Sequence, residues 1–184
     1  MKISVSVRHA AIEDAADLAR MHRATWQHAY RDVLPASFLQ SLDTTELEPN
    51  WEKDITKYQE AGNHIMLADT EHGAQGFVMF GRGHEGVTTP ATGPGHKLGQ
   101  IYSLYVMPNF QKHGLGKTMM EIAFEVLGSE SYTEVYLTTF EANVAAHRFY
   151  ERQGGINAGV ETIAEIGGEN VLSRAYWWPL TLQP

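Results

Sequence analysis

Hydrophobic and polar positions along the 184 residues follow two different periods, which predict both strands and helices. Two-residue alternation and short β-branched runs predict strands at 3–8, 64–70, 75–82, 101–106, 134–139, 156–166 and 170–178. Apolar stripes spaced by three and four residues predict helices starting near 12, 35 and 45, and two more over 119–126 and 143–153. Thr45 and Glu48 match a capping box at the start of the third helix, which we expect to end before Gly62.

The order of these elements predicts an α/β (α+β) fold. A strand, two or three helices and three strands precede a helix, a strand, a helix and two strands. Helices inserted between strand runs are typical of a mixed sheet covered by helices on both faces. We find no repeat or linker, and therefore expect one domain over residues 1–184. Residues 83–97 are rich in glycine and proline and predict an irregular, functional or mobile loop.

Composition narrows the classes of function. The chain has no cysteine, which excludes disulfides, thiolate nucleophiles and cysteine-ligated metals. Its formal net charge of −8 argues against nucleic-acid binding and weakly favours a cationic small substrate. No apolar run is long enough to span a membrane, and the strand-like start meets Arg8 too early for a signal peptide. We expect a cytoplasmic protein with no nucleic-acid or membrane partner.

A turn between a predicted strand and a predicted helix, residues 111–118, is suited to holding a phosphate. Gly114 and Gly116 let the backbone turn tightly and expose its N–H groups at a helix N-terminus. A dinucleotide-binding fingerprint would need glycine where Met119 stands, and a Walker A loop would need glycine where Gln111 stands. The remaining alternatives are a pyrophosphate loop of the form Q/R-x-x-G-x-G and an ordinary strand-to-helix connection.

Two motifs resemble those of the GCN5-related N-acetyltransferases (GNATs). The first is Gln111-x-x-Gly114-x-Gly116, preceded by a strand that ends at Val106. The second resembles N-x-x-A-x-x-F-Y-x-x-x-G and is matched by Asn143, Ala146, Phe149, Tyr150 and Gly154. The motifs cover residues 100–155, stand in the family's order and have a predicted strand between them. The resemblance implies a single-domain GNAT-like fold with a mixed, mostly antiparallel central sheet.

The resemblance also implies direct transfer of an acetyl group from acetyl-CoA to a primary amine, on a small molecule, a polyamine-like compound or a protein. Tyr150 would protonate the departing thiolate, and a phenol is a competent donor for that step. Coenzyme A would contact the strand, the turn and the second motif through Leu104, Tyr105, Val106, Gln111, Lys112, His113, Gly114, Leu115, Gly116, Lys117, Asn143 and Tyr150. Asn143 and the apolar members of the second motif also fit an N-cap and core positions.

The base that deprotonates the amine is open at this stage. Histone-acetylating GNATs use a glutamate on the central strand, and the corresponding position here is Gln100, which cannot accept a proton at neutral pH. Other groups near the expected site are candidates instead: His84, Glu85, His96, Tyr102 and Glu141. Histidine has the most suitable ordinary pKa for the task. The missing carboxylate also leaves a non-catalytic acyl-CoA-binding module as an alternative function.

Acceptor specificity is expected from the first helices, the 83–97 loop and the last hairpin. Trp26 and Tyr30, four residues apart on a helix, either line an amine pocket with Glu85 or belong to the core. The histidines show no metal-ligand spacing, so no metal is predicted. A further alternative is a structural interaction protein in which the strand containing Trp177 and Trp178 forms a dimer edge. A homodimer is also compatible with an enzyme.

Overall fold

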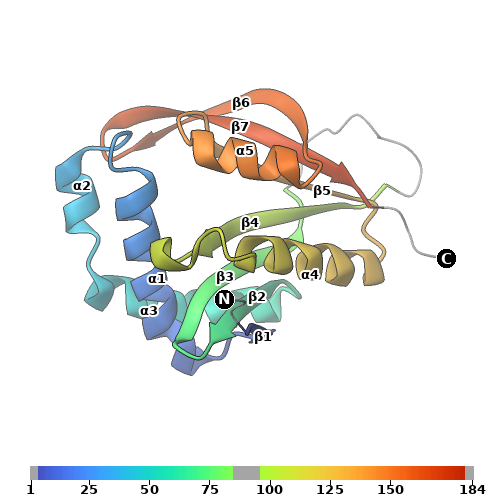
Figure 1. The fold of residues 1–184 in the computed structure, drawn as a ribbon, viewed down its shortest axis with the longest axis horizontal. Coiled ribbons are helices and arrows are strands. Elements are labelled where there is room, and N and C mark those ends of the chain that lie inside the picture. The colour runs from blue at the N-terminus through green and yellow to red at the C-terminus, as the bar shows by residue number, and fades with distance from the viewer. Residues whose placement is uncertain (1–3, 85–95, 181–184) are drawn as a thin grey trace. The chain divides into compact units, whose positions relative to one another are not determined.

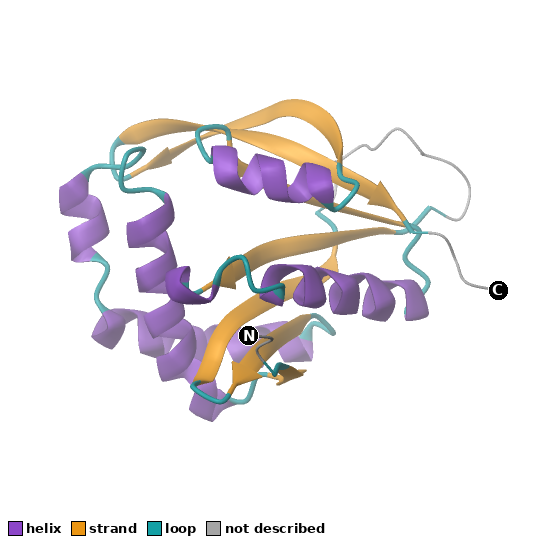
Figure 2. Ribbon diagram, in the orientation of Figure 1, coloured by secondary structure: helices purple, strands orange, loops and turns teal. Residues whose placement is uncertain are grey.

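The structure is a computed structural model that describes residues 4–84 and 96–180, apart from the side chains of residues 160–162. Helices and strands follow the predicted order (Figures 1 and 2). The strands are β1 (Ser6–His9), β2 (His64–Thr70), β3 (Gly73–Arg82), β4 (Leu98–Val106), β5 (Glu134–Phe140), β6 (Ile156–Ile166) and β7 (Glu169–Pro179). The helices are η1 (Ile12–Asp14), α1 (Ala15–Ala29), α2 (Ala36–Ser41), α3 (Thr44–Glu60), η2 (Pro108–Phe110), α4 (Leu115–Ser129) and α5 (Val144–Arg152), where η marks a 3₁₀ helix.

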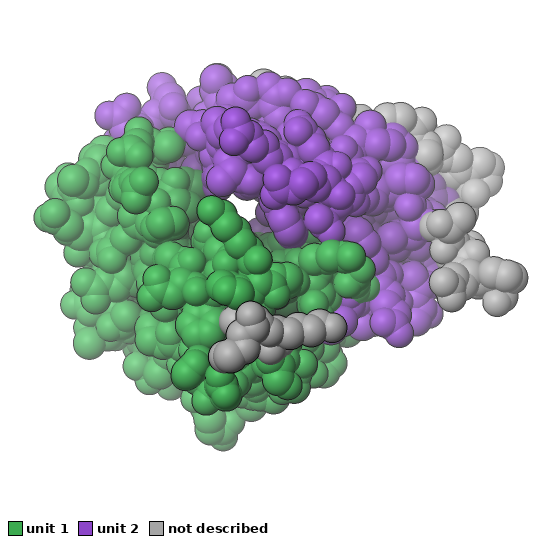
Figure 3. All heavy atoms as spheres, viewed as in Figure 1, with its two compact units in different colours: residues 1–80, 103–121 green, residues 81–102, 122–184 purple. Residues whose placement is uncertain are grey.

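The chain divides into two compact units (Figure 3). Unit 1 contains residues 1–80 and 103–121, and unit 2 contains residues 81–102 and 122–184. Strand β4 and helix α4 each pass from one unit into the other along the chain. The single domain expected over residues 1–184 stays a prediction.

The strands are hydrogen-bonded in the order β1-β2-β3-β4-β5-β7-β6. Antiparallel pairing joins β1 to β2, β2 to β3, β5 to β7 and β6 to β7. Strands β4 and β5 pair in parallel, with Leu98–Gln100 opposite Glu134–Tyr136. The predicted mixed, mostly antiparallel sheet is therefore confirmed.

In unit 1, helices cover both faces of the sheet. A methyl group added to Gly76 of β3 would lie 2.9 Å from the terminal methyl carbon of Met119, on α4. The next residue, Phe77, packs edge-on against Trp51 of α3 with ring centroids 5.3 Å apart. Because neighbouring residues of a strand point to opposite faces, α4 and α3 cover different faces of β3. Helix α1 lies beside α3 (Figure 1).

The start of α3 differs from the sequence expectation. The helix begins at Thr44, and the side chain of Asp43 accepts a hydrogen bond from the Thr45 N–H at 2.9 Å. Asp43 is thus the N-cap, and the prediction of a capping box formed by Thr45 and Glu48 is wrong. Asp is among the best N-cap residues, and the Asp43 carboxylate stands two residues before the Thr45 N–H that it accepts. Asp43 therefore takes the N-cap position in place of Thr45.

In unit 2, strand β7 is an interior strand. It pairs with β5 on one side and with β6 on the other, so the expectation that Trp177 and Trp178 form a dimer edge is wrong. The Trp178 side chain is buried under Phe124 of α4 and Tyr150 of α5, with ring centroids 5.5 and 6.1 Å away. The homodimer itself stays a prediction. Within residues 4–84 and 96–180, no helix is long and apolar enough to cross a membrane.

Candidate active site

The turn that follows β4 is anchored to its own unit by hydrogen bonds at its start. The Met107 N–H donates to the carbonyl oxygen of Gln75 at 2.8 Å, so the end of β4 is tied to β3. Residues Pro108–Phe110 then form η2, and the side-chain amide of Gln111 donates back to the Val106 carbonyl at 3.2 Å. These bonds fix where the chain leaves the sheet and where the glycine-containing segment begins.

Two residues of this turn have left-handed backbone conformations. Lys112 has φ of 64° and Gly114 has φ of 93°, and α4 begins directly afterwards at Leu115. A left-handed lysine is uncommon and indicates that the surrounding turn requires that conformation. The Thr118 N–H donates to the Gly114 carbonyl at 3.0 Å, and by helix geometry the N–H groups before it have no acceptor inside the helix.

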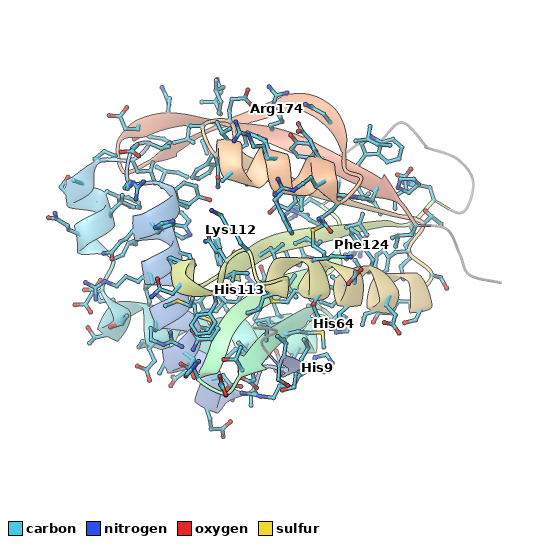
Figure 4. All side chains as sticks on the ribbon, in the orientation of Figure 1. His9, His64, Lys112, His113, Phe124 and Arg174 are labelled. Atoms are coloured by element: carbon cyan, nitrogen blue, oxygen red, sulfur yellow. The ribbon has the colours of Figure 1, made fainter. Side chains whose placement is uncertain are left out.

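The N–H groups that have no acceptor inside the helix therefore belong to Leu115, Gly116 and Lys117, at the positive end of the α4 dipole. The Leu115 side chain is 1% exposed, so burial holds the first turn of the helix in place. Lys112 and His113 are exposed beside this helix end (Figure 4), and the exposed Lys117 ammonium lies 3.6 Å from the Glu121 carboxylate. Backbone donors, a helix dipole and two lysines together suit the pyrophosphate of coenzyme A.

The three predicted residues of β4 divide between its two faces. Leu104 and Val106 point to one face and Tyr105 to the other, because side chains alternate along a strand. The parallel ladder with β5 covers Leu98–Gln100, and Leu104 and Val106 stand further along β4. The Tyr105 ring packs edge-on against Phe77 at 5.1 Å, and burial raises the pKa of its phenol. Its side chain is thus a packing element of unit 1.

Helix α1 supplies an aromatic cluster in unit 1. The Trp26 indole N–H donates to the Tyr105 phenol oxygen at 2.8 Å, and Tyr30 packs edge-on against the indole with ring centroids 5.2 Å apart. Tyr30 is 8% exposed, whereas Trp26 is half-buried. The structure brings together the two residues predicted to bind the amine and adds Tyr105 to them.

His22 is the member of this cluster that sequence reasoning did not single out. Its ring stacks on Tyr105 and lies 5.2 Å from Trp26 and 5.8 Å from Trp51, measured between centroids. Burial lowers the pKa of His22 to about 4, so the ring is neutral at pH 7. Its Nδ1 is buried and has no hydrogen-bond partner in the described part of the chain. The one available signal was its spacing of four residues from Trp26.

Unit 2 contains the second motif. The Asn143 side chain accepts a hydrogen bond from the Ala146 N–H at 3.2 Å, which confirms Asn143 as the N-cap of α5. Tyr150 is 7% exposed and its ring lies 5.8 Å from that of Tyr176. Gly154 has φ of 78° and ends the helix. The motif therefore places the candidate acid in the packed face of α5.

A network around the start of α5 was not expected from the sequence. Arg174 of β7 makes two hydrogen bonds to the Glu141 carboxylate, one of them at 2.6 Å, and holds the pKa of Glu141 below its ordinary value. The His147 ring lies 2.9 Å from the Glu141 carbonyl oxygen and 3.1 Å from the Tyr176 phenol oxygen. These contacts fix the segment that carries Asn143.

Among the candidate bases, Glu85 lies outside the described residues. Gln100, 7% exposed, accepts a hydrogen bond on its side-chain oxygen from the His84 N–H at 3.3 Å. His96 pairs with the buried Glu134 carboxylate at 2.7 Å. Within 4–84 and 96–180, no group of three or more histidine, aspartate or glutamate residues is arranged to hold a metal ion.

Comparison with known protein families gives one match over most of the chain. The family model described as "Acetyltransferase (GNAT) family" matches residues 17–155. This range contains the turn, both ends of α4 and the second motif.

Individual proteins that resemble this chain are also acetyltransferases, at low sequence identity. An uncharacterised N-acetyltransferase of Bacillus subtilis (strain 168), YuaI, is 25% identical over 176 residues, which is 95% of this chain and 93% of the relative. The PaiA N-acetyltransferase of Thermoplasma acidophilum, solved in complex with coenzyme A, has a TM-score of 0.68 at 17% identity and covers 93% of this chain and 98% of its own. YncA of Salmonella typhimurium, solved with acetyl-CoA, has a TM-score of 0.69 at 14% identity over 98% and 96% of the two chains. Because these two solved structures are less than 25% identical to this chain, they show a similarity of fold alone.

Proposed function

The chain belongs to the acetyltransferase (GNAT) family of enzymes, and on that premise we propose that it transfers the acetyl group of acetyl-CoA directly to a primary amine. The acceptor class is an amine on a small molecule, a polyamine-like compound or a protein. With no cysteine in the chain, an acyl-enzyme thioester has no place in the reaction. The amine and acetyl-CoA are proposed to be bound at the same time, so that the amine attacks the thioester directly.

The observation that carries this proposal is the turn ahead of α4. Lys112 and Gly114 adopt left-handed conformations, and the N–H groups of residues 115–117 follow at a helix N-terminus. A pyrophosphate carries two negative charges and several acceptor oxygens, and such donors bind it without side-chain rearrangement. Gln111, Lys112, His113 and Lys117 would add contacts around the same group.

The backbone of Leu104 and Val106 would bind the pantetheine arm and the thioester. An extended strand offers N–H and C=O groups at regular spacing, and an amide-rich pantetheine can hydrogen-bond to it as another strand would. Beside the thioester, a strand N–H would stabilise the oxyanion that forms when the amine attacks. Asn143, which caps α5, is also proposed to contact the pantetheine.

Tyr150 would act as the general acid. When the carbon–sulfur bond breaks, the thiolate of coenzyme A needs a proton, and a phenol can donate one. The ring of Tyr150 is held by its contacts with Tyr176 and Trp178, which would keep the hydroxyl in one place.

Trp26 is the residue proposed to contact the amine. An indole face attracts a cation, and the neutral His22 beside it adds no repelling charge at pH 7. Tyr30 is buried against Trp26, so its role would be to hold the indole.

Thermal unfolding with acetyl-CoA, coenzyme A, ATP and NAD in parallel tests the proposal. A ligand at about a hundred times its dissociation constant adds about 2.7 kcal/mol to the free energy of unfolding, a clear shift. We expect a shift with acetyl-CoA and coenzyme A alone, followed by turnover in a screen of alkylamines. A shift with ATP or NAD instead would refute the proposed donor. Coenzyme A binding without turnover of any amine would favour a non-catalytic acyl-CoA-binding module.

A further inference from the structure

We propose that His147 is a positioning residue for Tyr150, the proposed general acid, and that it acts in this way when both of its ring nitrogens are protonated. The inference rests on the proposed acetyl transfer and names a residue that makes that reaction depend on pH. It is carried by the hydrogen bonds between α5 and β7, which both belong to unit 2.

Helix α5 lies along β7 and presents one face to it (Figure 1). Tyr150 and Glu151 follow His147 by three and four residues, so both lie on the same side of the helix as His147. Tyr176 of β7 is fully buried. Its ring lies 5.7 Å from the His147 ring and 5.8 Å from the Tyr150 ring, measured between centroids. Tyr176 therefore contacts both the proposed acid and the proposed positioning residue.

The ring of His147 and the hydroxyl of Tyr176 share three polar contacts. Nε2 of His147 lies 2.9 Å from the carbonyl oxygen of Glu141, and Nδ1 lies 3.1 Å from the phenol oxygen of Tyr176. The phenol donates to the Glu151 carboxylate at 3.2 Å. Burial and the charge of Glu151 raise the pKa of Tyr176, so the phenol keeps its proton.

Counting the protons of these contacts shows which form of His147 completes them. A carbonyl oxygen and an ionised carboxylate only accept, so Nε2 carries a proton and the single hydroxyl proton of Tyr176 points to Glu151. The contact between Nδ1 and the phenol oxygen then needs a proton on Nδ1. A neutral imidazole has a proton on only one nitrogen. All three hydrogen bonds form together only when His147 is an imidazolium.

The charged groups that face this network are compatible with that form. Glu151 and Glu141 bring two negative charges, and the His147 ring lies close enough to Glu141 to lower the pKa of its carboxyl, as Arg174 also does. Arg174 of β7 (Figure 4) makes two hydrogen bonds to Glu141. With His147 protonated, two cations therefore balance two carboxylates.

Loss of one proton from His147 would break this arrangement on both sides of Tyr150. The Tyr176 hydroxyl could then donate to His147 or to Glu151, but not to both, and α5 would be tied to β7 by one hydrogen bond fewer. A general acid acts only while its proton is held within hydrogen-bond reach of its target. Histidine suits such control, because its ordinary titration falls between pH 5 and 8.

The first test compares the full chain carrying His147→Gln with the wild type at pH 6 and pH 9, using acetyl-CoA and an alkylamine that turns over in the screen described above. We expect kcat of the variant to be about tenfold lower at pH 6 and about equal at pH 9, where the wild type has lost the proton. The ratio of the two kcat values cancels the titration of the amine itself. A ratio that does not change with pH would overturn the proposal.

The second variant, Glu151→Gln, should remove the need for the extra proton. An amide can donate to the Tyr176 oxygen, which lets the Tyr176 hydroxyl donate to a neutral His147. Its kcat should equal that of the wild type at pH 6 and exceed it by about tenfold at pH 9. Glu125→Gln, at an exposed position of α4, is the matched control and should follow the wild type at both pH values. A Glu151→Gln variant with the pH dependence of the wild type would contradict the proton count.

Nitrogen NMR of the full chain without substrate tests the proton count apart from activity. At pH 6 both ring nitrogens of His147 should show slowly exchanging protons, because both are hydrogen-bonded, whereas the exposed His9 should show none. The Nδ1 proton should be lost in Tyr176→Phe. A single ring proton on His147 would overturn this inference while leaving acetyl transfer intact.

Failure of the wild type to bind coenzyme A would overturn the proposed function, and the role of His147 with it. Coenzyme A binding by each variant, measured by thermal shift, shows that the variant is folded.

Discussion

The indole N–H of Trp26 and the phenol oxygen of Tyr105 form a 2.8 Å hydrogen bond that joins α1 to β4. The two residues are 79 positions apart in the chain. Tyr105 stands between Leu104 and Val106, the residues proposed to bind pantetheine. The hydrogen bond therefore links the proposed amine-binding ring to the strand that would hold the acetyl donor.

Replacing Trp26 by Leu should weaken acceptor binding specifically. Loss of a cation–π contact worth about 0.5–2 kcal/mol predicts a rise of about tenfold in KM for a cationic amine. The dissociation constant of coenzyme A should stay unchanged. Steady-state kinetics with varied amine, together with calorimetric titration of coenzyme A, measure the two effects separately.

Trp26→Phe is the matched control. It keeps an aromatic face but removes the N–H that Tyr105 accepts, so KM should rise less, while the free energy of unfolding falls by about 1 kcal/mol. Identical KM values for the wild type and both variants would exclude Trp26 from the amine site.

Gly114→Ala should weaken coenzyme A binding. An added methyl group would meet no atom within 4 Å, but φ of 93° is strained for any residue with a Cβ, by about 1–2 kcal/mol. Relief of that strain would turn the N–H groups in the first turn of α4 away from the pyrophosphate. We expect coenzyme A affinity to fall about tenfold, measured by calorimetry.

Gly128→Ala is the control on the same helix. Gly128 also has open space for a methyl group, and in an α-helix alanine is favoured over glycine by up to about 1 kcal/mol. This variant should be as stable as the wild type or more so, with unchanged affinity. Equal coenzyme A affinities for the two variants would mean that the turn does not hold the pyrophosphate.

The sequence predicts local structure well here because each strand and helix has its own periodicity and its own end signals. Gly114 was recognised as a turn position from its motif, Gly154 directly follows the helix predicted over 143–153, and both have positive φ. The start of α3 was misplaced because Thr45 and Asp43 are both good caps, and only the backbone shows which one accepts the hydrogen bond.

Contacts between distant segments could not be predicted in the same way. Nothing near Trp26 in the sequence indicates Tyr105 as its partner, and nothing near Glu141 indicates Arg174. Likewise, two adjacent tryptophans suggested an exposed edge, but hydrogen bonding to β5 and β6 makes β7 an interior strand. Pairing order in a sheet depends on the whole chain.

Tyr150→Phe should lower turnover and leave coenzyme A binding intact. The phenylalanine ring can keep the contacts with Tyr176 and Trp178, so the change removes only the hydroxyl. Loss of a general acid predicts a fall of about 10²-fold in kcat. Tyr58→Phe on α3 removes a hydroxyl that has no part in the proposed site and should not change kcat. Unchanged turnover in Tyr150→Phe would remove Tyr150 as the acid.

His22 should make the stability of the protein depend on pH between about 6.5 and 4. Burial lowers its pKa in the folded state to about 4, whereas an unfolded histidine has an ordinary value near 6.5. As the pH falls below 6.5, the unfolded state takes up the proton first, so folding loses stability until the folded state is protonated near pH 4. Above pH 6.5 the contribution is fully present. The shift corresponds to roughly 3 kcal/mol.

Urea unfolding of the wild type and of His22→Gln at pH 7 and pH 4 measures this effect. Other groups, such as the Arg8–Asp14 ion pair, also titrate in acid, but they are common to both proteins and cancel in the difference. The wild type should lose about 3 kcal/mol more than the variant between the two pH values. Equal losses would mean that the His22 ring takes up a proton in the folded state as readily as in the unfolded chain. Burial would then not keep His22 neutral beside Trp26.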